Sequence, residues 1–196
     1  IIFDVGQVLV DYDWETYLDS FGFEPAKRER IAKATFQSPV WDERDRGLYE
    51  EDVYLKQFQE LDPEDAEDIE KVIRGTGGTI HKRPYADTWV KYLKSKGYHV
   101  YILSNYSSYM LDHTKKELTF RREMDGEVFS CYAKQLKPDA EIYQIILNKY
   151  QLKPEECVFI DDRSENCRGA QEQGIHTICF KDFKQVTADL EKLGVK

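Results

Sequence analysis

The chain has 196 residues, and its 28 Lys and Arg against 37 Asp and Glu give a net charge of −9 at pH 7. Domains typically have about 100–200 residues, so we expect one domain with a smaller inserted part. The acidic balance argues against nucleic acids and anionic membranes as partners, because both are polyanions. No apolar stretch approaches the about 18–20 residues of a membrane span, and no signal-peptide pattern opens the chain, so a cytoplasmic protein is expected.

The first expected element is a short buried strand, Ile-Ile-Phe at residues 1–3, which ends at Asp4. A turn containing Gly6 follows, and then the run Leu-Val-Asp at 9–11. A buried strand gains nothing from a carboxylate at its carboxyl end, which is where open parallel sheets place their ligand crevices. We therefore predict that Asp4 is a site residue. The alternative is an Asp that only forms the turn before Gly6.

Residues 14–80 differ from the rest of the chain in composition. Charged residues are denser there, and apolar residues recur at helical spacing, as at Val53, Phe58 and Leu61. Four residues that interrupt helices divide this part into about four short helices: Pro25, Pro39, Gly47 and Pro63. The segment Gly-Thr-Gly-Gly at 75–78 is interpreted either as a hinge or as an ordinary surface turn. We expect a helical subdomain at 14–80, inserted into a core formed by residues 1–13 and 81–196.

From residue 81 onward, helix-like segments alternate with apolar runs. We expect helices over 84–97, around 142–146 and over 170–174, and strands over 98–103, 157–160 and 177–180. This alternation predicts an α/β fold with a Rossmann-like parallel sheet. Because crossover connections are right-handed, the carboxyl ends of the strands should meet at one rim.

Polar residues follow two of these strands. Ser104 and Asn105 offer a hydroxyl, an amide and backbone N–H groups to an oxyanion, although an ordinary helix N-cap is the alternative. Asp161 and Asp162 are adjacent like charges, which repel each other unless a cation neutralises them, so they predict a magnesium site. Lys137 precedes Pro138, a common pattern at helix entry, and a lone Lys is usually solvated.

Four cysteines lack any paired spacing and are interpreted as reduced core thiols, rather than as metal ligands or disulfides: Cys131, Cys157, Cys167 and Cys179.

The ordered set of Asp4, Ser104–Asn105, Lys137 and Asp161–Asp162 resembles the haloacid dehalogenase (HAD) superfamily, whose members are mostly aspartate-nucleophile phosphatases. One branch carries an α-helical cap, as residues 14–80 would be here. The resemblance implies that Asp4 is the nucleophile, that Ser104 and Asn105 bind the phosphate, and that Lys137 is the catalytic cation that neutralises it. It also implies that magnesium is held by Asp4, the Gly6 carbonyl and Asp162, with Asp161 bonding through water or to Lys137 and with Asn166 beside them.

Gly6 is the main departure from that superfamily, because most of its phosphatases carry a second Asp there as general acid and base. Such proton transfer contributes roughly 10²–10⁴-fold, so either another group replaces the missing Asp or the substrate does not need it. Esters with a less basic leaving group need it least. The run Phe-Asp-Val-Gly-Gln-Val-Leu-Val-Asp at 3–11 resembles a bacterial branch that includes glucose-1-phosphate phosphatases. The segments 43–47 and 137–139 share this resemblance. It implies a sugar phosphate, such as glucose 1-phosphate, as substrate. Because Gly6 offers no base, we expect the second step, hydrolysis of the aspartyl phosphate, to be slow.

In the expected cap, Trp41, Arg44 and Arg46 are predicted to line the substrate pocket. The alternatives are a solvated face for the two arginines and the cap core for Trp41. Two other functions stay open. One is a 2-haloacid dehalogenase, which also lacks the second Asp and needs no metal; the other is a non-catalytic sugar-phosphate-binding protein. The chain is expected to be a monomer or a homodimer.

Overall fold

The computed structural model describes residues 1–195 and is built around a five-stranded parallel sheet. Its central strand β1 (Ile2–Phe3) lies between β4 (Tyr101–Ser104) and β6 (Val158–Asp161). The edges are β5 (Gly126–Phe129) and β7 (His176–Cys179), which gives the order β5-β4-β1-β6-β7. The predicted α/β fold with a parallel sheet is confirmed.

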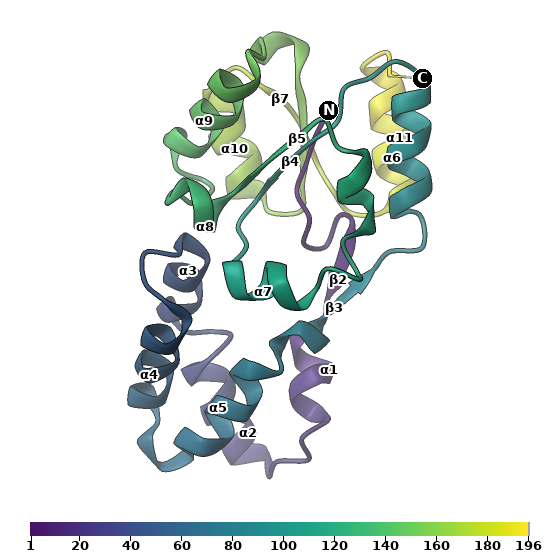
Figure 1. Cartoon of the computed structure of the whole chain (residues 1–196). Coiled ribbons are helices and arrows are strands. Elements are labelled where there is room, and N and C mark those ends of the chain that lie inside the picture. The colour runs from purple at the N-terminus through teal and green to yellow at the C-terminus, as the bar shows by residue number, and fades with distance from the viewer. Residues whose placement is uncertain (196) are drawn as a thin grey trace.

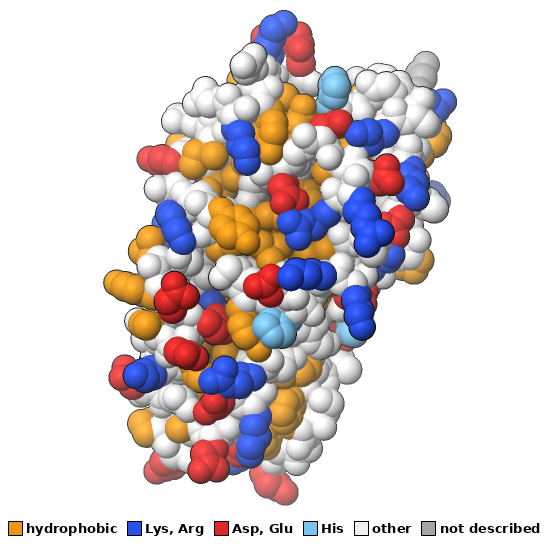
Figure 2. Space-filling view, in the orientation of Figure 1, with side chains coloured by type: hydrophobic (Ala, Val, Ile, Leu, Met, Phe, Trp, Pro, Cys, Tyr) orange, Lys and Arg blue, Asp and Glu red, His pale blue; other side chains and the backbone are white. Residues whose placement is uncertain are grey.

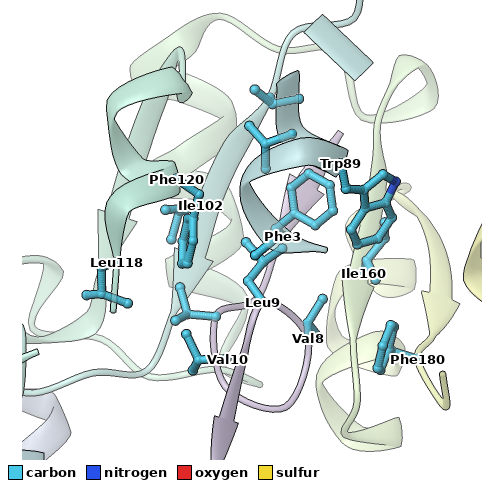
Figure 3. Close-up of a cluster of buried hydrophobic side chains, with 14 of the residues drawn as sticks. Phe3, Val8, Leu9, Val10, Trp89, Ile102, Leu118, Phe120, Ile160 and Phe180 are labelled. Carbon is cyan, nitrogen blue, oxygen red and sulfur yellow. The ribbon is translucent and has the colours of Figure 1, made fainter. Parts of the chain in front are cut away.

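The two residues of β1 point to opposite faces of the sheet, as successive residues of a strand do. Phe3 packs against Trp89 of α6 (Ala86–Ser95), with ring centroids 4.9 Å apart, in the cluster that Figure 3 shows. Ile2 lies in a second buried cluster with Ile142 of α9 (Ala140–Tyr150). Both strand residues are 0% exposed, so apolar packing on two sides fixes the point where the strand ends.

Helices cover both faces of the sheet. Figure 1 shows α6 beside α11 on one side and α9 beside α10 on the other. The remaining helices of this part are α7 (Ser108–His113), α8 (Ser130–Ala133), α10 (Ser164–Glu172), α11 (Phe183–Lys192), and the 3₁₀ helices η3 (Thr119–Glu123) and η4 (Pro154–Glu156).

A two-stranded antiparallel ribbon joins the sheet to the helical segment, by which we mean the chain between the two ribbon strands. The ribbon consists of β2 (Val10–Tyr12) and β3 (Ile80–Lys82), with Tyr12 opposite Ile80. The helical segment contains five α-helices and two 3₁₀ helices: α1 (Trp14–Asp19), α2 (Pro25–Ala34), α3 (Pro39–Arg46), α4 (Glu51–Leu61), η1 (Pro63–Asp65), α5 (Ala66–Arg74) and η2 (Thr76–Thr79). It has its own buried core and lies at the end of the molecule away from both termini (Figure 1).

Some boundaries differ from those predicted. The segment has five α-helices instead of about four, and the boundary expected after residue 80 falls inside β3. Strands β4 and β6 begin later and include Ser104 and Asp161 as their last residues. Strand β5 was not predicted. Only Val128 and Phe129 of this edge strand are buried, and two apolar residues are too few to identify a strand from the sequence.

The cysteine prediction was wrong for one residue. All four thiols are free and three are buried, but Cys179, the last residue of edge strand β7, is exposed.

On the face in Figure 2, basic and acidic side chains are interspersed over both parts of the molecule. Among residues 1–195, no helix has the length and apolar character needed to cross a bilayer.

Candidate active site

The sheet register brings three polar residues to one rim. Phe3 pairs with Ile102 on one side and with Ile160 on the other, so the next residue along each strand continues toward the same edge. Asp4 directly follows β1, and its backbone N–H donates to the Ile160 carbonyl at 2.9 Å. The carboxyl ends of β1, β4 and β6 therefore meet, as ligand crevices of open α/β sheets require.

Asp4 is 7% exposed and is held by three donors on one carboxylate oxygen. Its Oδ1 accepts from the Val5 N–H at 2.7 Å and the Ser104 hydroxyl at 2.6 Å, and Lys137 Nζ lies 2.8 Å away. Within residues 1–195 these donors all contact Oδ1, and Oδ2 accepts no hydrogen bond. Burial raises the pKa of Asp4, Lys137 opposes that rise, and the nearby Asp161 charge adds to it. The side chain is thus fixed in orientation with one oxygen left for chemistry.

Lys137 is a buried cation between two carboxylates. Its Nζ lies 2.8 Å from Asp4 Oδ1 and 2.7 Å from Asp161 Oδ2, and the side chain is 1% exposed. Burial acts to lower the pKa of the ammonium group, but Asp161 and Asp4 together raise it above its usual value. The solvated alternative for Lys137 therefore does not describe its position.

Asn105 holds the Lys137 backbone in place. Its Nδ2 donates to the Lys137 carbonyl at 3.0 Å, and its Oδ1 accepts from the Lys137 N–H at 2.9 Å. The neighbouring helix α7 begins only at Ser108 and is capped by the Ser107 side chain, so neither Ser104 nor Asn105 is an N-cap. Ser104 contacts the nucleophile candidate Asp4 instead, and the Asn105 amide is committed to the Lys137 loop.

Asp161 and Asp162 differ sharply in their surroundings. Asp161 is 0% exposed and accepts from the Arg163 N–H at 2.8 Å, from Lys137, and from Asn166 Nδ2 at 3.0 and 3.1 Å. Asp162 is half-buried, and burial followed by the Asp161 charge raises its pKa. Asp162 therefore needs a cation more than Asp161 does.

Asp4, Asp161 and Asp162 can each offer a carboxylate oxygen within 4.8 Å of the others. Carboxylate oxygens are the ligands that Mg²⁺ and Ca²⁺ prefer. In addition, Asn166 Oδ1 is buried without a hydrogen-bond partner in the described chain, so a further oxygen next to Asp161 has unmet capacity. These residues fit a hard divalent cation.

Gly6 leaves open space beside Asp4. A Cβ added there would meet no heavy atom within 4 Å, and the φ of Gly6 is not positive. The strained residue of this turn is Gln7, at φ 57°, whose amide donates to the Tyr12 carbonyl at 2.9 Å.

Helix α3 of the helical segment separates two cavities next to this rim. One, of about 90 Å³, is lined mainly by apolar and aromatic residues: Gly6, Tyr12, Trp41, Asp45, Ile80, Asn105, Tyr106 and Met110. The other, of about 320 Å³, is more polar: Pro39, Asp42, Glu43, Arg46, Asn105, Leu136, Lys137, Pro138, Asp139 and Arg163. A larger hollow of about 600 Å³ lies at the amino ends of the strands, on the opposite edge from the carboxylates.

The three predicted cap residues have separate placements. Arg46 lines the polar cavity. Trp41 lines the apolar cavity and also packs against Phe36 and Phe58 in the core of the helical segment. Arg44 was assigned wrongly to the substrate pocket. It is 2% exposed, pairs with Glu51 at 2.6 and 3.0 Å, and its guanidinium lies over the Trp41 and Tyr109 rings.

Four further residues border the site and carry no individual role predicted from the sequence: Tyr12, Asp45, Tyr106 and Arg163. The spacing of Trp41 and Asp45, one helical turn apart, is a signal that they share a helix face.

Comparison with known proteins identifies the family. The family model of haloacid dehalogenase-like hydrolases matches residues 1–174, and the chain belongs to this family. Flavin mononucleotide hydrolase 1 of Arabidopsis thaliana is 25% identical over 100% of this chain and 77% of its own length. D-ribitol-5-phosphate phosphatase of Bacteroides thetaiotaomicron is 26% identical over 90% of this chain and 89% of its own length.

Among solved structures, the HAD family enzyme bt-2542 of Bacteroides thetaiotaomicron, crystallised with magnesium and inorganic phosphate, has a similar fold. The two structures superpose with a TM-score of 0.74, at 22% identity and over 94% of this chain and 96% of the other.

Proposed function

We propose that the protein is a magnesium-dependent phosphomonoester hydrolase that acts on a small phosphorylated metabolite through an aspartyl-phosphate intermediate. The observation that carries this proposal is the environment of Asp4, whose Oδ1 is fixed by Ser104 and Lys137 while Oδ2 has no hydrogen-bond donor among the described residues. A carboxylate becomes a useful nucleophile for phosphorus when it is held in line and its charge is balanced. The phosphatase and hydrolase names of the two relatives support the same reaction class.

In this mechanism Asp4 Oδ2 attacks phosphorus, the bond from phosphorus to the ester oxygen breaks, and water then releases phosphate from Asp4. Ser104 and Lys137 orient Asp4, and the Lys137 ammonium balances charge on the phosphoryl oxygens. Asn105 keeps the Lys137 loop in place. Magnesium, when held by Asp4, the Gly6 carbonyl and Asp162, with Asp161 beside them, would neutralise the charge of the transferring group.

We propose that residues 14–80 act as a cap over a core of residues 1–13 and 81–196, and that the leaving group occupies the cavities beside α3. Both cavities are small, which supports a metabolite of sugar-phosphate size, with glucose 1-phosphate as the first candidate. The net charge of −9 supports a small ester bound by local positive charge rather than a nucleic acid or a membrane. A cytoplasmic location and a monomeric or homodimeric state complete the proposal.

The test is release of inorganic phosphate from a panel of sugar phosphates, including glucose 1-phosphate and ribitol 5-phosphate, with Mg²⁺ and with EDTA. Asp4→Asn should abolish release, whereas Asp112→Asn, an equal charge change on the exposed face of α7, should not. No release across the panel would contradict the proposal. Chloride release from 2-haloacids without Mg²⁺ would instead identify the protein as a dehalogenase. The three clustered carboxylates argue against that function, because dehalogenation needs no metal.

A further inference from the structure

Hydrolysis of an alkyl phosphate needs a proton for the departing oxygen, and the residues around Asp4 do not provide one. Lys137 and Asp161 neutralise each other, and Ser104 is bonded to Asp4. Gly6 has no side chain, although the space beside it would accommodate one. The donor must therefore come from another element that reaches this cavity.

Asp45 is placed to meet this need from the opposite wall. It lies in the last turn of α3 and lines the apolar cavity together with Gly6 and Asn105. Within residues 1–195 its carboxylate forms no ion pair: the neighbouring Arg44 pairs with Glu51, and Arg46 pairs with Glu43 and Asp139. An acid that faces a ligand cavity without a cationic partner is free to exchange a proton.

The backbone at Asp45 and two residues after it is anchored to the core. The Ser130 hydroxyl of α8 donates to the Asp45 carbonyl at 2.6 Å and accepts from the Tyr106 N–H at 2.8 Å. Gly47, at φ 72°, lies so close to α8 that an added Cβ would be 2.9 Å from the Cys131 Cα. The Lys134 ammonium also donates to the Gly47 carbonyl. These contacts hold the end of α3 against the core, and with it the position of Asp45.

Several charged and titratable groups act on Asp45. Burial raises the pKa of its carboxyl to about 7, Arg44 and the Ser107 N–H oppose the rise, and Asp42 and Asp4 add to it. The other titratable groups around it keep their protons at neutral pH: burial raises the pKa of Tyr12 and of Tyr106 well above the usual value, and that of Cys131 to about 11. Among the groups on this wall, Asp45 can both give and take a proton near neutrality.

We propose that Asp45 is the proton carrier of this active site, a catalytic residue supplied by the helical segment in place of a side chain at Gly6. As Asp4 bonds to phosphorus and the phosphorus–oxygen ester bond breaks, the Asp45 carboxylic acid protonates the departing oxygen, which leaves as an alcohol. The Asp45 carboxylate then takes a proton from the water that attacks the aspartyl phosphate. Phosphate is released, and Asp4 and Asp45 return to their starting states.

This inference rests on the proposed function, and its test separates the two. Asp45→Asn keeps the size of the side chain but cannot transfer a proton. We expect kcat/KM for the best sugar phosphate of the panel to fall by roughly 10²–10⁴-fold, the usual contribution of general acid catalysis. For p-nitrophenyl phosphate, whose leaving group needs no proton, the fall should stay below about tenfold, because only the first chemical step governs kcat/KM.

Two matched variants complete the experiment. Gly6→Asp added to Asp45→Asn should restore much of the sugar-phosphate activity, because it puts a carboxyl into the open space beside Asp4. Asp52→Asn, which removes the same charge from an 81% exposed side chain on α4, should behave like the native protein. Equal losses for both substrates in Asp45→Asn would overturn the inference while leaving the hydrolase intact. A native protein inactive on both substrates would instead reject the proposed function.

A second measurement needs no variant and remains available if Asp45→Asn does not fold. In D₂O the native protein should show a normal solvent isotope effect on kcat/KM for the sugar phosphate and a much smaller one for p-nitrophenyl phosphate. Equal isotope effects for the two substrates would contradict proton donation to the leaving group.

Discussion

Asn105 and Lys137 exchange two hydrogen bonds, one from the Asn105 amide nitrogen to the Lys137 carbonyl at 3.0 Å and one from the Lys137 N–H to the Asn105 Oδ1 at 2.9 Å. The loop after β4 is thereby tied to the loop that carries the ammonium group. We therefore expect Asn105 to act on the proposed phosphate site through Lys137, as a positioning residue.

This pairing predicts that Asn105→Asp is more harmful than its size suggests, because the new carboxylate faces the Lys137 carbonyl with no proton to donate. We expect a loss of about 1–3 kcal/mol in the free energy of unfolding, as for a buried group left unsatisfied, and a fall in kcat with little change in the magnesium requirement. Urea denaturation and steady-state kinetics would measure both. An unchanged stability would show that the two loops hold their positions independently.

Lys137→Met should make stability depend strongly on pH. Removal of one partner from a buried ion pair typically costs about 3–5 kcal/mol, and here two carboxylates, Asp4 and Asp161, lose their cation. Burial already raises the pKa of Asp4 in the native protein, and loss of the opposing Lys137 charge would raise it further. The loss of stability should therefore be small at low pH and grow as pH rises through the folded pKa of Asp4. Urea titrations at pH 5 and pH 8 should show this contrast. A loss of equal size at both pH values would argue against charge as its cause.

Magnesium should stabilise the folded protein through the three clustered carboxylates. Because a ligand that binds only the native state stabilises it by mass action, we expect the melting temperature to rise with Mg²⁺ concentration. Asp162→Asn should remove most of that rise, since Asp162 is the carboxylate without a protein cation. Asp112→Asn serves as the matched control, and differential scanning fluorimetry supplies the readout. An unchanged rise of the melting temperature with Mg²⁺ in Asp162→Asn would show that the ion binds elsewhere than at this cluster.

The raised pKa of Asp45, about 7, has a defined effect on stability. Its folded pKa exceeds that of an unfolded Asp, so the folded state binds more protons between about pH 4 and pH 7 and loses stability as pH rises through that window. Asp45→Asn should therefore be more stable than the native protein at pH 8, by about 1–3 kcal/mol after discounting for partial exposure, and no more stable near pH 4. A pH-independent difference would contradict the assigned titration.

Burst kinetics would separate the two halves of the reaction. The sequence predicts a slow second step because Gly6 offers no base, but an Asp45 carboxylate in the cavity removes that reason. We expect native protein to release p-nitrophenol linearly, and Asp45→Asn to give a burst close to one equivalent per enzyme, since phosphorylation stays fast while hydrolysis of the aspartyl phosphate loses its base. Stopped-flow absorbance would record either time course, and a burst in native protein alone would reverse the assignment.

The rim of the site was predictable from sequence because parallel strands bring their carboxyl ends together. Asp4, Ser104 and Asp161 each stand at or directly after the end of an apolar run. The register of the parallel sheet then places all three at the same edge. Lys137 was located only by its order in the resemblance, since nothing in a Lys-Pro pair tells that the side chain will be buried between two acids.

The helical segment was less predictable because its roles depend on docking rather than periodicity. In α3, charged residues occupy most positions, so sequence alone does not tell which face packs. The sequence therefore predicts a substrate contact for Arg44, whereas in the structure Arg44 is buried and forms an ion pair with Glu51. Asp45 went without a role of its own because its position follows from how Gly47 meets α8, a contact between segments more than 80 residues apart.

That contact also gives the active site a built-in length limit. Where Gly47 touches Cys131 there is no room for even one extra methyl group, so α3 cannot approach the core more closely than it does. A substrate too long for the space beneath it would have to lift α3 away, and Asp45 would move with the helix. Such a molecule could place its phosphate on Asp4 and still leave slowly, because the proton needed for its departure would be out of reach.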